Sequence, residues 1–148
     1  MNSILKYASM TLALLAISLA MPVSAVEKPF AEHKVVLQIS DNDPFKQTLV
    51  LNVANNITKA YGIDNVDIQI VAFGPGLRLL FADNANAPRI QSLVDNADVK
   101  FHACKNTIAN MGKQLGEPPV INSVATTDSG GVARILELRS KGYELIKP

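Results

Sequence analysis

The sequence contains one cysteine, Cys104, in the segment Phe101-His102-Ala103-Cys104-Lys105. The residues before it have the pattern of a strand and those after it the pattern of a helix, which predicts a thiol at a strand-to-helix junction. A thiolate at a helix N-terminus faces unpaired N–H groups and the positive end of the helix dipole, and both lower the pKa of cysteine. The position predicts a reactive thiol. The alternative is a neutral cysteine packed as a small hydrophobe.

His102 lies two residues before Cys104, and this spacing on a strand places both side chains on one face. A histidine there would be able to accept the thiol proton, as in Cys–His pairs; the alternative is a packed or hydrogen-bonded histidine. Nothing completes a triad, because the other histidine, His33, lies in the short lead-in before the first predicted strand. We predict no metal site within the chain, since one cysteine and two distant histidines fall short of a structural zinc set; copper or zinc bound across a subunit interface is the alternative.

The strands and helices that position these side chains are predicted from alternating strand-like and helical patterns in the sequence. Helices are predicted at 45–61, 87–96, 106–115 and 132–141, with a short helical turn at 77–81, and strands at 34–40, 66–73, 98–103, 120–125 and 143–146. Asp43-Pro44 has the pattern of an N-cap followed by proline in the first turn. This alternation predicts an open, mostly parallel five-stranded sheet with helices on both faces.

In open sheets of this kind, ligands bind at the carboxyl ends of the strands. That rule selects the loops 41–44, 74–77, 104–107 and 126–131. Their candidate binding residues are Asn42, Gly74, Gly76, Asn106, Thr107, Ser129 and Gly130. The Gly-Pro-Gly turn lacks the spacing and lysine of a P-loop, and the dinucleotide fingerprint is absent, so we predict no cofactor. The alternative for Gly74-Pro75-Gly76 is a tight turn without a ligand. The N–H groups of Ser129-Gly130-Gly131 suit an oxyanion, and the alternative there is an ordinary helix start.

The first 25 residues have the pattern of a secretory signal peptide. Lys6 precedes an apolar run over 10–21, and Val23-Ser24-Ala25 supplies a cleavage site. We therefore predict export to the periplasm and a single mature domain over 26–148; an uncleaved N-terminal anchor is the alternative. The mature chain has thirteen basic and thirteen acidic residues, which argues against a nucleic acid or an anionic membrane surface as partner. Exported proteins usually pair their cysteines in disulfides. A single cysteine is therefore expected to be buried and inert, to form a disulfide with another molecule, or to be a reactive thiol.

The motif Cys104-Lys-Asn-Thr107, together with the segment from Ser129 to Pro148, resembles the DsrE/DsrF-like (sulfur-relay, YchN-like) family over about 34–148. The resemblance implies a three-layer α/β/α fold, assembled as homotrimers or hexamers. It also implies that Cys104 carries sulfur as a persulfide and passes it to a thiol or sulfur-carrier partner protein, with Asn106 and Thr107 shaping the loop. The best-known members are cytoplasmic, whereas this chain is predicted to reach an oxidising compartment.

We therefore expect a periplasmic sulfur carrier, rather than a turnover enzyme, with Cys104 as the acceptor. The alternative is a noncatalytic module that binds a small anion or a protein and in which Cys104 is structural. A redox partner held through a mixed disulfide is a third hypothesis, and it lacks the second cysteine of a CxxC motif.

Overall fold

The computed structural model describes residues 28–148, so the predicted signal peptide and its cleavage site lie outside the described part. No helix within residues 28–148 is long and apolar enough to cross a membrane. The strands are β1 (His33–Ile39), β2 (Val66–Ala72), β3 (Lys100–Ala103), β4 (Ala125–Thr126) and β5 (Glu144–Ile146). The helices are α1 (Pro44–Tyr61), η1 (Gly74–Leu80, a 3₁₀ helix), α2 (Ala87–Ala97), α3 (Lys105–Leu115) and α4 (Gly131–Ser140).

The five strands form one sheet in the order β4-β3-β2-β1-β5, and every pair of neighbours runs parallel. This confirms the predicted α/β class with a five-stranded parallel sheet. Strand β2 lies at the centre, and all seven of its residues are buried. All carboxyl ends of the strands meet at one edge of the sheet, which brings the loops after β1, β2, β3 and β4 together there.

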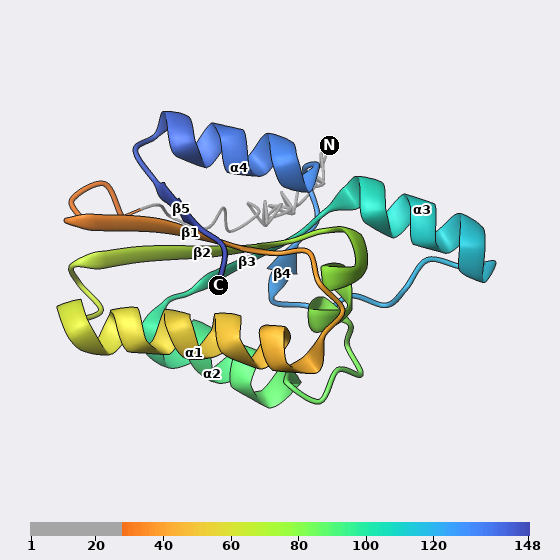
Figure 1. Ribbon diagram of the computed structural model, residues 1–148, viewed down its shortest axis with the longest axis horizontal. Coiled ribbons are helices and arrows are strands. Elements are labelled where there is room, and N and C mark those ends of the chain that lie inside the picture. Colours follow the sequence, from red (N-terminus) through yellow and green to blue (C-terminus); the bar gives the residue numbers. More distant parts are fainter. Residues whose placement is uncertain (1–27) are drawn as a thin grey trace, which may run out of the picture.

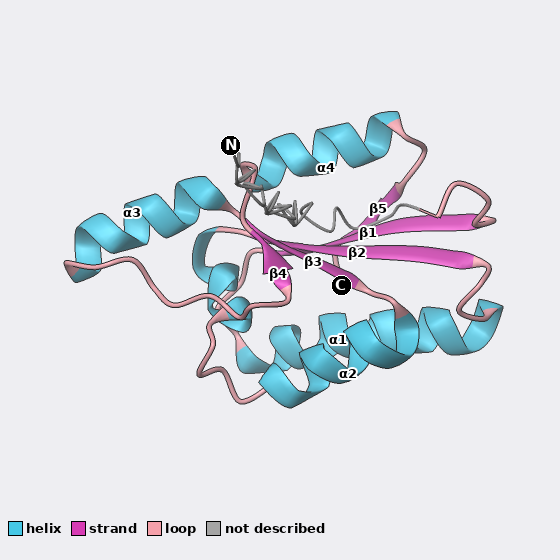
Figure 2. Ribbon diagram, turned by 180° about the vertical axis from the view of Figure 1, so that it is seen from behind, coloured by secondary structure: helices cyan, strands magenta, loops and turns pink. Residues whose placement is uncertain are grey.

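Helices cover the two faces of the sheet unequally. Helices α1 and α2 lie on one face and α4 lies on the other (Figure 1). Within residues 28–148, the cluster on the α1/α2 side holds nineteen buried hydrophobic residues and the cluster under α4 holds five. Helix α3 extends away from the sheet at the carboxyl edge (Figure 2), and none of its residues is buried.

The start of α1 follows the predicted capping pattern. Asp43 is extended and its carboxylate accepts a hydrogen bond from the Phe45 N–H at 2.8 Å, with Pro44 next to it in the first turn. Because proline has no N–H to lose, it fits this position.

The fourth strand differs from its predicted range of 120–125. Ile121 instead forms an isolated antiparallel bridge with Phe81, and the Asn122 side chain accepts the Val124 N–H at 3.2 Å. This Asn122 turn redirects the chain, so that only Ala125–Thr126 pairs with β3. The predicted short turn after β2 is also longer than expected, because a 3₁₀ helix begins at Gly74.

Candidate functional site

Cys104 is the N-cap of α3, at the carboxyl edge of the sheet. Its backbone is extended, its N–H donates to Ala72 O at 3.0 Å, and its carbonyl accepts from the Ile108 N–H at 3.0 Å. The first bond continues the pairing with β2 and the second opens the helix. The cysteine backbone is thus fixed between a strand and a helix, and the residue is 6% exposed.

Donors from two helices converge on the Cys104 sulfur. Burial raises the pKa of this thiol, but hydrogen bonds from the Thr107 hydroxyl and from the N–H groups of Gly131, Thr107 and Asn106 outweigh burial, so the pKa lies below the ordinary value. Asn106 and Thr107 belong to the first turn of α3, and Gly131 is the first residue of α4. We call these three residues, with Cys104, the thiol cradle. Hydrogen-bond donors placed in this way favour the thiolate over the neutral thiol.

The Thr107 hydroxyl is oriented by the turn after β2. Its oxygen accepts the Gly74 N–H at 3.0 Å, which leaves its hydrogen to donate to Cys104. Thr107 and Gly74 also line an open cleft of about 280 Å³ beside the first turns of α3. Gly74 therefore acts on the thiol through Thr107.

The loop before α4 packs closely on the thiol cradle. The Ser129 carbonyl accepts the Lys105 N–H at 3.0 Å, which ties this loop to the start of α3. A Cβ on Gly131 would lie 2.8 Å from Phe73 Cβ, so glycine allows the N-terminus of α4 to approach β2. Gly130 lies beside the Asn106 amide.

Two of the predicted binding residues lie apart from the thiol cradle. Asn42 is exposed, and no hydrogen bond or ion pair between it and the cradle occurs in the described part of the chain. Gly76 is buried against the end of β1, where a Cβ would lie 2.6 Å from Ile39 O. Gly76 thus serves close packing between η1 and β1.

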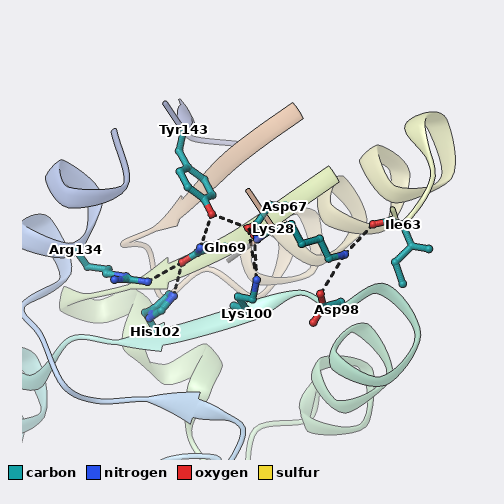
Figure 3. Close-up of polar contacts among 9 residues, drawn as sticks. All are labelled: Lys28, Ile63, Asp67, Gln69, Asp98, Lys100, His102, Arg134 and Tyr143. Carbon is teal, nitrogen blue, oxygen red and sulfur yellow. Dashed lines mark hydrogen bonds and ion pairs between the residues drawn. The ribbon is translucent and has the colours of Figure 1, made fainter. Parts of the chain in front are cut away.

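His102 makes two hydrogen bonds, and neither goes to Cys104. Its Nε2 lies 2.8 Å from Gln69 Oε1, and its Nδ1 lies 2.6 Å from the Thr126 hydroxyl (Figure 3 shows the first). Because Gln69 Oε1 is an acceptor, Nε2 carries the hydrogen and Nδ1 accepts from Thr126. Burial, followed by the nearby Arg134 charge, lowers the pKa of His102 to about 4, which keeps the ring neutral. In this arrangement His102 is not placed to deprotonate the thiol.

A buried polar network extends from His102 along the same face of the sheet (Figure 3). Gln69 Nε2 donates to the Tyr143 hydroxyl at 2.8 Å, and this hydroxyl donates to Asp67 at 2.7 Å. Asp67 also pairs with Lys100 at 3.3 Å. Asp67 and Gln69 were not among the predicted site residues, although they alternate with apolar residues in the central strand, which is the pattern of a strand with one polar face.

Acid is expected to destabilise the fold through His102. The unfolded ring takes up a proton below its ordinary pKa of 6.5, whereas the folded ring resists protonation down to about 4. Stability is therefore lost as pH falls through this window, by on the order of 2–3 kcal/mol. Urea unfolding of the wild type and of His102→Gln at neutral and mildly acidic pH tests this, with exposed His33→Gln as the matched control. We expect a flatter pH profile in His102→Gln alone; parallel profiles in all three proteins would contradict the prediction.

Within residues 28–148, no group of three or more His, Cys, Asp or Glu side chains is placed to hold a metal ion. The fold and the thiol cradle define an α/β protein with an open parallel sheet whose single cysteine lies where a strand meets a helix at the carboxyl edge.

Comparison with known proteins supports the fold. The chain is similar in structure to MTH1491 of Methanobacterium thermoautotrophicum, a protein of unknown function, with a TM-score of 0.67 and 24% sequence identity over 78% of this chain and 99% of that chain. No protein-family model and no curated protein matches the chain. The structural similarity shows a shared fold.

Proposed function

We propose that this protein is a sulfur carrier in which Cys104 accepts sulfane sulfur and passes it to another thiol. The observation that carries the proposal is the thiol cradle, because hydrogen bonds from the starts of two helices and from the Thr107 hydroxyl stabilise a thiolate. The thiolate is the nucleophilic form of cysteine. The resemblance to sulfur-relay proteins supports the same role for this position.

The transfer conserves atoms and electrons without a cofactor. The Cys104 thiolate attacks the outer sulfur of a donor R–S–SH, a new S–S bond forms, and the donor S–S bond breaks with its electron pair leaving on R–S⁻. Cys104 then carries a persulfide whose outer sulfur keeps the donor proton. An acceptor thiolate attacks that outer sulfur in the second step, and Cys104 leaves as a thiolate. The cradle donors stabilise Cys104 as nucleophile first and as leaving group later.

The low exposure of Cys104 favours one alternative, a binding module in which the cysteine is structural. The surroundings of the sulfur distinguish the two hypotheses. A structural cysteine packs among apolar side chains, and burial then raises its pKa. Here polar donors lower the pKa below the ordinary value, so the carrier is the better supported hypothesis.

Replacing Cys104 with serine is expected to abolish sulfur uptake. The purified mature protein is treated with a sulfane donor and its intact mass is measured; the wild type should gain one sulfur atom and Cys104→Ser should gain none, because this is the chain's only thiol. A wild-type mass that stays unchanged, with a thiol that is alkylated slowly, would refute the carrier and leave the binding module.

We further propose that the protein works in the periplasm as a homotrimer or homohexamer and transfers sulfur to a partner protein. The pattern of residues 1–25 supports export. Helix α3 supports assembly, because none of its eleven residues is buried and, in the described part of the chain, only Ile108 and Met111 of this helix pack, partly buried, against the main core.

A further inference from the structure

The Gln69 side chain joins three separate elements on the α4 side of the sheet (Figure 3). Gln69 lies on the central strand β2 and is 0% exposed. Its oxygen accepts from His102 on β3 at 2.8 Å and from Arg134 on α4 at 3.0 Å. Its nitrogen donates to Tyr143, just before β5, at 2.8 Å. Both ends of the amide are therefore committed, which fixes its orientation.

Arg134 makes a directional attachment of α4 to the sheet. The apolar contacts of the helix come from buried Ile135 and Leu138, and apolar contacts do not define direction. Arg134 Nη2 bonds to Gln69, while Nη1 lies 3.0 Å from both carboxylate oxygens of Glu137 on the same helix. A guanidinium whose two terminal nitrogens are both hydrogen-bonded has one orientation. The bond to Gln69 therefore restrains where α4 lies along β2.

That restraint acts one helical turn from the thiol cradle. Arg134 follows Gly131 by three residues in α4, so the two residues lie on the same side of the helix. The 3.0 Å bond from the Lys105 N–H to the Ser129 carbonyl holds the start of α4 beside the start of α3. There the Gly131 N–H donates to Cys104, whereas Asn106 and Thr107 donate from α3. A small shift of α4 would weaken this hydrogen bond while leaving the donors of Asn106 and Thr107 in place, since hydrogen bonds weaken steeply when misaligned.

We propose that Gln69 is a positioning residue for the sulfur site: through Arg134 it holds α4 where the Gly131 N–H reaches Cys104. Gln69 has no hydrogen bond to the thiol itself, and its role is exerted through the helix. The inference rests on the proposed function only in that the ionised thiol is the working group.

The test compares Gln69→Leu with Tyr143→Phe. Both variants remove a hydrogen bond of the Gln69 amide, but only Gln69→Leu removes the acceptor of Arg134. Thiol ionisation is followed by the ultraviolet absorbance of the thiolate against pH and by the alkylation rate at neutral pH. We expect alkylation about three- to tenfold slower in Gln69→Leu, which corresponds to a pKa raised by roughly half to one unit, and wild-type ionisation in Tyr143→Phe.

Arg134→Lys provides a second variant in case Gln69→Leu does not fold. It keeps the positive charge but lacks the planar fork that reaches both Gln69 and Glu137, so its thiol ionisation is expected to shift in the same direction. Wild-type ionisation in Arg134→Lys would overturn the inference, and so would an equal shift in Tyr143→Phe, because that would indicate general loosening. Failure of sulfur uptake in a wild type with normal ionisation would refute the carrier function and leave the positioning role intact.

Discussion

Replacing Thr107 with valine is expected to raise the pKa of Cys104 and to slow its alkylation and sulfur uptake at neutral pH about tenfold. Valine keeps the shape of threonine but removes the hydroxyl that donates to the sulfur. The same change leaves the Gly74 N–H without its acceptor, so the turn after β2 loses its link to α3. Absorbance of the thiolate against pH measures the ionisation directly, and the alkylation rate measures its consequence.

Thr107→Ser is the matched control, because it retains the hydroxyl and loses only a methyl group. It should keep thiol ionisation near that of the wild type, whereas valine should shift it. Equal ionisation in Thr107→Val and the wild type would show that the N–H groups alone hold the thiolate. A large shift in Thr107→Ser would show that packing of the methyl group, and not the hydroxyl, matters.

Replacing Gly76 with alanine is expected to destabilise the fold by about 3 kcal/mol. The new Cβ would lie 2.6 Å from Ile39 O and 2.7 Å from Ser40 Cα. These are backbone atoms at the end of β1, so relief requires η1 or β1 to move, and the carboxyl edge would be disturbed. Urea unfolding at neutral pH measures the loss.

Gly130→Ala is the control for the Gly76 prediction. The tightest contact of its Cβ would be with the end of the Asn106 side chain, at 3.0 Å, and that amide can rotate away. We expect a change of less than about 1 kcal/mol. A similar loss of stability in both variants would contradict the prediction, because it would show that the loss at Gly76 does not come from its close contact with the backbone of β1.

Local patterns in the sequence were sufficient for most of the fold. The Asp43-Pro44 cap and the apolar spacing after it predicted α1, and the alternation of elements predicted parallel pairing. Strand order was not accessible, because it depends on which crossovers pack together. The fourth strand was placed wrongly because Ile121 pairs antiparallel with Phe81 instead, a contact between distant segments.

The sequence predicted only those parts of the candidate site whose residues lie close together along the chain. Cys104 and Thr107 lie within one turn of helix, so their proximity follows from spacing. The Gly131 N–H reaches the thiol because α4 packs on β2, and the bonds of His102 depend on Gln69 and Thr126 from neighbouring strands. Such long-range contacts have no spacing rule in the sequence.

The unequal covering of the two faces has a consequence for the ionisation of the sulfur. Since α4 rests on five buried hydrophobic residues of the described chain and the opposite layer on nineteen, lifting α4 costs less free energy than detaching α1 and α2. Gly131 moves with α4, so a fluctuation that lifts this helix withdraws a hydrogen-bond donor from Cys104. Ionisation of the thiol is therefore coupled to the seating of this helix: the thiolate is best stabilised when α4 is packed on the sheet.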